Sequence, residues 1–183
     1  TVCFHLGSVT QADVARAEEG QRALGAAVQH KAEALQVARA LEGPLPDRLL
    51  PSLEAAWLAQ LRAVLASGRT PVLFTSRGEL VCRHAEERRA LGLALAAAMA
   101  RLGGTLAPQL GYLISKGGIT SQTLLADGLG LRQVRLEGQL LPGLSMLRTG
   151  AEHETAPLLP LLTFPGNLGQ ADTLRQAWEQ MEQ

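Results

Sequence analysis

Residues 110–121 read Leu-Gly-Tyr-Leu-Ile-Ser-Lys-Gly-Gly-Ile-Thr-Ser, and this stretch is the most informative part of the chain for the fold. Its first half, 110–115, is an apolar run typical of a buried strand, and residues 122–129 after it are typical of a short helix. Gly117 and Gly118 therefore lie at a strand-to-helix turn, where glycine allows a positive φ and a close approach of a ligand. The free N–H groups and positive dipole end of the helix predict a seat for a phosphate or carboxylate. A tight turn that needs glycine only for steric reasons is the alternative.

Polar side chains flank the glycine pair. Thr120 and Ser121 would add hydroxyl donors to the site, and Thr120 is also a candidate cap for the helix. Lys116 is one of only two lysines in the chain. We interpret it first as a solvated surface residue, and alternatively as a positive charge at the rim of the anion site.

Strand-like and helix-like segments alternate along the whole chain. Strands are expected at 1–6, 26–30, 71–75, 110–115, 131–136, 144–147 and 158–164. Helices are expected at 10–24, 32–41, 51–67, 86–102, 122–129 and 170–181, with Pro51 in a first turn and Gly103-Gly104 as a stop. This alternation predicts an α/β fold, a three-layer domain with a mainly parallel sheet and helices on both faces.

Turns rich in glycine or hydroxyl groups follow four of the expected strands. They are Gly7-Ser8-Val9-Thr10, Ser76-Arg77-Gly78, Gly117-Gly118-Ile119-Thr120 and Pro165-Gly166-Asn167-Leu168-Gly169. In α/β sheets ligands bind outside the carboxyl ends of the strands, so these turns can converge on one phosphate-bearing ligand.

Composition excludes several classes of function. The 183 residues fit one domain, and the 17 basic and 17 acidic residues cancel, which argues against a nucleic-acid-binding surface. No run of about 18 apolar residues predicts a membrane span. Cys3 and Cys82 are interpreted as reduced thiols of a cytoplasmic protein. Because the chain opens in mid-strand without an initiator Met, we expect it to be part of a longer polypeptide.

Common catalytic motifs are absent from the sequence. It has no Gly-x-Gly-x-x-Gly, no Walker-type lysine loop and no Gly-x-Ser-x-Gly. Its four histidines show no ligand spacing with cysteines or carboxylates, so no metal site is predicted. Among isolated carboxylates, Asp127, Glu137 or Asp172 could help to hold Mg2+, but each is interpreted first as a surface residue.

Three motifs occur in a fixed order along the second half of the chain. They are Lys116-Gly117-Gly118-Ile119-Thr120-Ser121, Gly138-Gln139-Leu140-Leu141-Pro142-Gly143 and Phe164-Pro165-Gly166-Asn167-Leu168-Gly169. In order and spacing they resemble the C-terminal nucleotide-binding domain of the four-carbon acid sugar kinases, as do Gly7-Ser8 and Thr75-Ser76-Arg77-Gly78. The resemblance covers residues 1–183 and is strongest over 110–176.

The resemblance implies a function and a set of binding residues. Family members use ATP with Mg2+ to phosphorylate threonate, erythronate or their oxo forms. It implies that Ser8 contacts the nucleotide, that Gly117, Gly118, Ile119 and Thr120 cradle phosphates mainly through backbone N–H groups, and that Gly166 and Asn167 line the nucleotide pocket. It assigns no catalytic or metal-binding residue to this chain.

In the same family the sugar acid and the presumed catalytic carboxylate belong to a separate N-terminal substrate domain, which nothing in residues 1–183 resembles. The chain would then be the ATP-binding half of an active site and its own N-terminal domain the main partner, while a homodimer stays open. The alternatives are a non-catalytic module that binds a nucleotide or phosphorylated metabolite, and a structural α/β domain whose glycines only serve turns.

Overall fold

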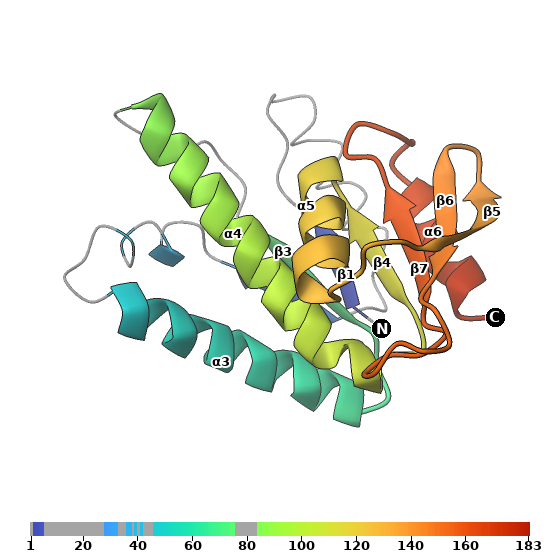
Figure 1. Cartoon of the computed structure of the whole chain (residues 1–183), viewed down its shortest axis with the longest axis horizontal. Helices are drawn as coiled ribbons and strands as arrows, with labels where there is room; N and C mark the ends of the chain where they lie inside the picture. The colour runs from blue at the N-terminus through green and yellow to red at the C-terminus, as the bar shows by residue number, and fades with distance from the viewer. Residues whose placement is uncertain are drawn as a thin grey trace.

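A seven-stranded sheet forms the centre of the fold (Figure 1). The computed structural model describes residues 2–5, 28–32, 36, 37, 39, 41, 46–75 and 84–183. The strands lie in the order β2-β3-β1-β4-β7-β6-β5. Their bounds are β1 Val2–His5, β2 Val28–Ala32, β3 Pro71–Thr75, β4 Leu113–Lys116, β5 Arg135–Leu141, β6 Leu144–Arg148 and β7 Pro160–Phe164.

Strand direction divides the sheet into two parts. β2, β3, β1, β4 and β7 pair in parallel, with Lys116 at the end of β4 in register with His5 of β1 and Phe164 of β7. β6 and β5 extend the sheet as an antiparallel hairpin beyond β7. The α/β class is confirmed, but the prediction of a mainly parallel sheet is incomplete at this end. Pro142 and Gly143, at the end of the second motif, form the turn of this hairpin, with Gly143 at φ +80°.

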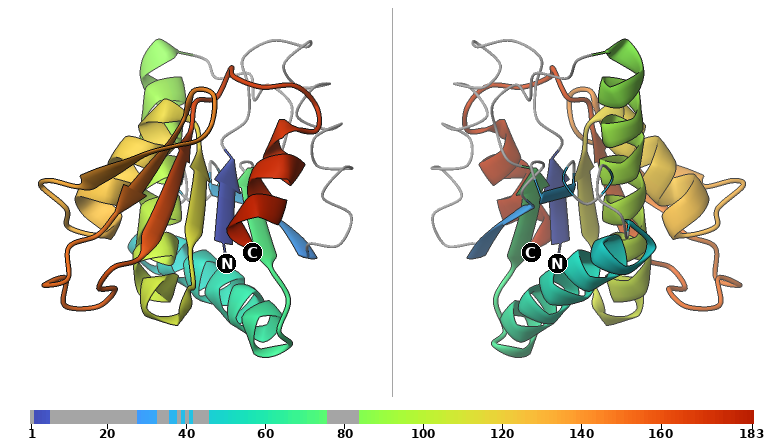
Figure 2. Two further views of the ribbon diagram at one scale, coloured as in Figure 1. Left: turned by 90° about the vertical axis from the view of Figure 1, so that its right-hand side faces the viewer. Right: turned by 90° about the vertical axis from the view of Figure 1, so that its left-hand side faces the viewer.

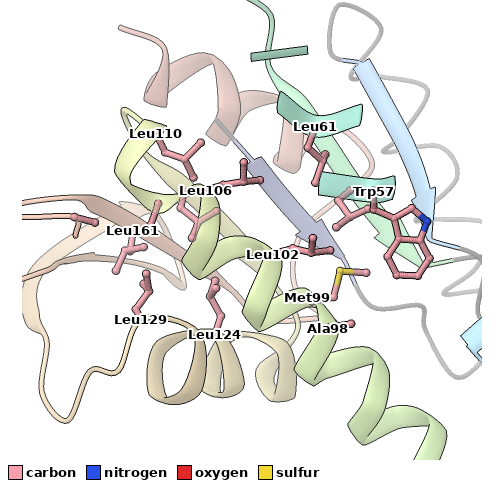
Figure 3. Close-up of a cluster of buried hydrophobic side chains, with 14 of the residues drawn as sticks. Trp57, Leu61, Ala98, Met99, Leu102, Leu106, Leu110, Leu124, Leu129 and Leu161 are labelled. Carbon is pink, nitrogen blue, oxygen red and sulfur yellow. The ribbon is translucent and has the colours of Figure 1, made fainter. Parts of the chain in front are cut away.

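Helices cover both faces of the sheet, so the three-layer prediction is confirmed (Figure 2). The described helices are α3 Pro46–Ala66, α4 Ala85–Leu106, α5 Gly118–Thr123 and α6 Thr173–Met181, together with a 3-10 turn, η1 Ala107–Gln109, and a π-helical turn, η2 Leu124–Gly128. Figure 3 shows Trp57 and Leu61 of α3 packed with Leu102 and Leu106 of α4 in the core on one face. Leu174 and Ala177 of α6 pack with Ile114 and Leu162 on the other face.

The glycine pair at 103–104 does not end α4, so this prediction is wrong. The helix continues to Leu106 because these positions serve helix packing. A Cβ on Gly104 would lie 2.0 Å from the carbonyl oxygen of Gly128 in η2, and a Cβ on Gly128 would lie 2.4 Å from that of Ala100 in α4. Only glycine at both positions allows this close contact between the two backbones.

Other boundaries differ from the prediction in informative ways. Pro46, rather than Pro51, occupies the first helical position of α3, so residues 46–50 belong to the helix. The strand expected at 131–136 is instead β5, which begins at Arg135 and contains irregular pairing around Gly138. The last helix begins at Thr173, three residues later than expected. The helix expected at 10–24 lies outside the described residues.

One described helix is long and apolar enough to cross a membrane by length and composition. It covers Ala85–Gln109, and its most apolar window has a mean hydropathy of 1.5. Half of that window is buried inside the domain, and the helix contributes Leu91, Leu95, Met99, Leu102 and Leu106 to the core. The core helix of a globular domain satisfies the same criterion, so one such helix is weak evidence for a membrane span.

Candidate functional site

The turn between β4 and α5 is built around the backbone of Gly117. This residue has φ 109° and ψ 132°, a conformation that residues with a Cβ rarely adopt. Its N–H donates to the carbonyl of Phe164 on the neighbouring β7, at 2.8 Å, and its carbonyl accepts from the N–H of Ser121, at 2.9 Å. Gly117 is therefore fixed between the sheet and the first helical turn, and its contribution to a site is backbone conformation.

The next three residues present the N–H groups of a helix start. Gly118, Ile119 and Thr120 are the first residues of α5, where no preceding helical carbonyl can accept their hydrogen bonds. Gly118 is exposed and Ile119 is 65% exposed. α5 continues directly into η2, so the helical segment runs from Gly118 to Gly128. A helix follows the glycine turn as predicted, but it begins at Gly118 rather than at residue 122, so the second glycine belongs to its first turn.

Thr120 does not cap the helix as expected. The N-cap position is Gly117, where no side chain makes a capping hydrogen bond. The Thr120 side chain is fully buried, and its Oγ1 has no hydrogen-bond partner among the described residues. A buried polar group without a partner costs about 1–3 kcal/mol, so this hydroxyl is suited to a ligand atom at the turn. Ser121 differs, because its hydroxyl hydrogen-bonds to Ser115 of β4 at 3.0 Å.

Lys116 is buried, so its interpretation as a solvated surface residue is wrong. Only 8% of the residue is exposed. Its Nζ donates to the carbonyl oxygens of Pro165 at 3.2 Å, Gly166 at 3.1 Å and Leu168 at 3.5 Å. The same nitrogen lies 3.8 Å from the centre of the Phe164 ring. Because β4 and β7 are neighbours, the side chain reaches from the end of one strand across the loop that leaves the other.

The loop at 165–169 lies directly beside the glycine turn. A Cβ on Gly166 would lie 3.6 Å from the Cα of Gly117, so the two backbones are in contact. Gly169 has φ +89°, and a Cβ there would lie 2.9 Å from Cβ of Thr173. Gly166 and Asn167 are exposed next to the turn, but they precede α6 by several residues and do not form its start.

The second sequence motif, Gly138 to Gly143, contacts the same loop through the hairpin turn. The N–H of Gly143 donates to Oε1 of Gln139 at 3.1 Å. A Cβ on Gly143 would lie 2.6 Å from Cδ2 of Leu168, so this turn packs against the loop. Figure 1 shows the β5–β6 turn at the same end of the sheet as the loop that leaves β7. All three motifs therefore form one contiguous unit at the carboxyl ends of β4 and β7.

Comparison with known proteins agrees with this geometry. A family profile described as the nucleotide-binding C-terminal domain matches residues 7–174. The chain belongs to this family. The recognition made from the three motifs is thereby confirmed. No curated protein matches the sequence significantly.

Two solved proteins share the fold of this nucleotide-binding domain. One, from Bordetella bronchiseptica, is a domain of unknown function (DUF1537) with bound citrate, described as a domain-swapped dimer. Its sequence is 20% identical and the TM-score is 0.68; the match covers 98% of this chain and 41% of that chain. The other is a proposed tRNA synthase from Salmonella typhimurium LT2, 17% identical with a TM-score of 0.67, covering 98% and 40%. The chain therefore spans about two-fifths of the length of these structures.

Some predicted contributors to the nucleotide-binding domain lie outside the described residues. These are Gly7-Ser8-Val9-Thr10, including the candidate ligand Ser8, and Ser76-Arg77-Gly78. The strands before them are described: β1 ends at His5 beside Lys116, and β3 ends at the buried Thr75. Both strands thus end at the same edge of the sheet as the described part of the site.

Acidic side chains do not gather in the described part of the domain. Among the residues that the structure describes, no group of three His, Cys, Asp or Glu residues could hold a metal ion. Glu137 instead pairs with Arg148 at 2.7 Å, and the hydrogen bond from Arg148 lowers the pKa of this exposed carboxyl. Asp172 accepts a hydrogen bond from Gln176 at 2.6 Å.

Sequence reasoning missed the roles of Lys116, Gly143 and Leu168, because contacts between loops leave no local pattern.

Proposed function

We propose that this nucleotide-binding domain is the ATP-binding C-terminal half of a kinase that phosphorylates a four-carbon sugar acid, of the threonate, erythronate or oxo-tetronate type. The observation that carries the proposal is the assembly of three ordered motifs into one unit at the carboxyl ends of β4 and β7. Ligands of α/β sheets bind at this edge. Membership of the nucleotide-binding family supports the ligand class.

The residues around the turn fit a phosphate group. In this proposal the N–H groups of Gly118, Ile119 and Thr120 hold phosphate oxygens, since they lie at a helix start without helical acceptors. The buried Thr120 hydroxyl donates to one of these oxygens, which satisfies a group that otherwise has no described partner. Gly117 shapes the turn, and Gly166, Asn167 and Ser8 line the nucleotide pocket.

Mg2+ is proposed to arrive with the nucleotide rather than on a carboxylate cluster of this domain. The described residues offer no such cluster. When bound to the phosphates, Mg2+ neutralises their charge, and the protein contributes chiefly by positioning the phosphates and adding electrostatic stabilisation. The part of this chain is thus to hold the donor phosphates in a fixed position.

The acceptor side of the reaction is proposed to come from an N-terminal substrate domain of the same protein. The chain spans only about two-fifths of the solved structures that share its fold, and we assign it no base for the attacking hydroxyl. The description of the Bordetella protein as a domain-swapped dimer supports a homodimer here as well. A cytoplasmic location is proposed because the substrates are metabolites and both cysteines are interpreted as reduced thiols.

Calorimetry with a glycine variant tests the binding half of the proposal. The space around a Cβ at Gly118 is open to the described residues, so Gly118→Val should fold, while its side chain would occupy the place of the phosphates. Titration of the full-length protein with ATP and Mg2+ should give binding for the wild type and a loss of about tenfold or more for the variant. Gly92→Val in α4, another open helical glycine, is the matched control and should bind as the wild type does.

Activity separates the kinase from a non-catalytic module. The full-length protein should form ADP with threonate, erythronate or an oxo-tetronate as acceptor. ATP binding without phosphorylation of any of these acids would favour the module, and absence of ATP binding would remove the kinase.

A further inference from the structure

The buried ammonium group of Lys116 is a feature that the phosphate site does not require. It belongs to the strand before the glycine turn, but its three carbonyl contacts are all on the loop after β7. An ammonium group carries three N–H donors and no acceptor, so it suits a cluster of carbonyl oxygens. The face of the Phe164 ring adds a cation–π contact at 3.8 Å.

We propose that Lys116 is a positioning residue, which clamps the loop at 165–169 onto the glycine turn and so fixes the nucleotide pocket. Its acceptors include the carbonyl of Gly166 itself and lie on both sides of Asn167. Among the described residues, the loop also contacts the two neighbouring turns through Gly166 on Gly117 and Leu168 on Gly143. Both of these are packing contacts, whereas the lysine supplies the charged hydrogen bonds, which are the stronger class.

This geometry distinguishes the clamp from a phosphate ligand. A lysine that binds phosphate must direct its Nζ at the ligand, whereas this Nζ is directed at backbone carbonyls and an aromatic ring. Loss of the clamp should therefore weaken all nucleotides equally, because it displaces the pocket. Loss of a phosphate ligand should weaken ATP most and AMP least, because each phosphate adds charge.

The binding experiment uses Lys116→Met, which keeps an unbranched apolar stem and removes the ammonium. The dissociation constants of ATP, ADP and AMP are measured for the full-length protein, and this arm rests on the proposed nucleotide-binding function. We expect each to rise by about 10- to 100-fold and by the same factor, as for loss of a hydrogen bond to a charged group. Arg148→Met is the matched control, because Arg148 also donates to a loop carbonyl, that of Leu158 at 2.9 Å, but at the opposite end of the sheet.

A second readout needs no nucleotide. Hydrogen exchange of the amides at 166–169 should speed up in Lys116→Met, while exchange in β3 and α4 stays unchanged. Failure of the wild type to bind any nucleotide would remove the proposed function, yet this exchange arm would still test the clamp. Unchanged exchange in the loop, or a loss of affinity that grows with the number of phosphates, would overturn the proposal.

A conservative variant covers the case in which Lys116→Met does not fold. Lys116→Arg keeps the charge, but its planar fork cannot meet three carbonyls arranged around one point. We expect intermediate exchange in the loop and an intermediate, phosphate-independent loss of affinity. Loop exchange at the wild-type rate together with a loss of affinity would contradict the clamp, because affinity would then fall without any loosening of the loop.

Discussion

Substitution of Gly104 by alanine should destabilise the domain strongly, although alanine is the better helix former. Gly104 lies inside α4, so the change gains about 1 kcal/mol of helix propensity. The new Cβ would, however, lie 2.0 Å from the carbonyl oxygen of Gly128, whereas ordinary contact begins at 3.4 Å. The obstacle is backbone, which cannot rotate away as a side chain can, so α4 and η2 must separate by roughly 1 Å.

The magnitude follows from these two opposing effects. Overpacking a core costs about 1–3 kcal/mol and more where the neighbour cannot yield, so we take about 3 kcal/mol here. After subtraction of the propensity gain, Gly104→Ala should lower the free energy of unfolding by about 2 kcal/mol. For a domain of this size that corresponds to a melting temperature lower by about 4–8 °C.

The same helix contains a control for this prediction. Gly92 is exposed, and a Cβ at this position meets no described atom within 4 Å. Gly92→Ala should therefore raise the free energy of unfolding by up to about 1 kcal/mol. Urea unfolding followed by circular dichroism measures both variants. If Gly104→Ala were as stable as Gly92→Ala, the close contact between α4 and η2 would be refuted.

Two further substitutions test the site and the carboxyl-terminal helix. Thr120→Val replaces a buried hydroxyl without a described partner by a methyl group, so the free energy of unfolding without ligand should stay level or rise by up to about 1 kcal/mol. Calorimetry should show ATP affinity lower by about tenfold. A clear loss of stability would mean that the hydroxyl already has a hydrogen-bond partner. Glu182 is exposed. Desolvation raises the pKa of its carboxyl, but the hydrogen bonds from Tyr112, Thr70 and Trp178 together lower this pKa by more, so the net shift is downward. The carboxylate should contribute less than about 1 kcal/mol of stability. This contribution should be present above the unfolded glutamate pKa of about 4.3 and be lost as pH falls through the lower folded pKa. Urea titrations from pH 7 to 3 should show that Glu182→Gln removes this part of the pH dependence.

Sequence patterns predicted the elements that are formed by an uninterrupted run of buried apolar residues. The run at 71–75 was predicted as a strand and is β3 with the same bounds. The run predicted as a strand at 110–115 forms β4 only from Leu113 to Lys116. The 3-10 turn η1, which contains Pro108, lies before this run at 107–109. The glycine turn itself was predictable because its signal, a strand, two glycines and a helix start, is local.

Features that depend on neighbours in space were not predictable from local patterns. Gly103 and Gly104 carry the usual signal of a helix end, but the decisive fact is the approach of η2, which belongs to residues twenty positions later. The burial of Lys116 likewise depends on a neighbour in space. A lysine beside two glycines is typical of a solvated rim, and only the adjacency of β4 and β7 directs its ammonium onto the carbonyls of the next loop.

The antiparallel hairpin explains how the second motif reaches a site made by parallel strands. A parallel strand has only its carboxyl end at the ligand-binding edge. β6 runs the other way, with Ser145 near its start in register with Thr163 near the end of β7. The turn that precedes β6 therefore lies at this edge, where Gly143 meets Leu168 of the loop clamped by Lys116. Reversal of one strand thus joins a motif more than twenty residues away to the site, while the connection from β6 to β7, at 149–159, lies at the opposite edge of the sheet.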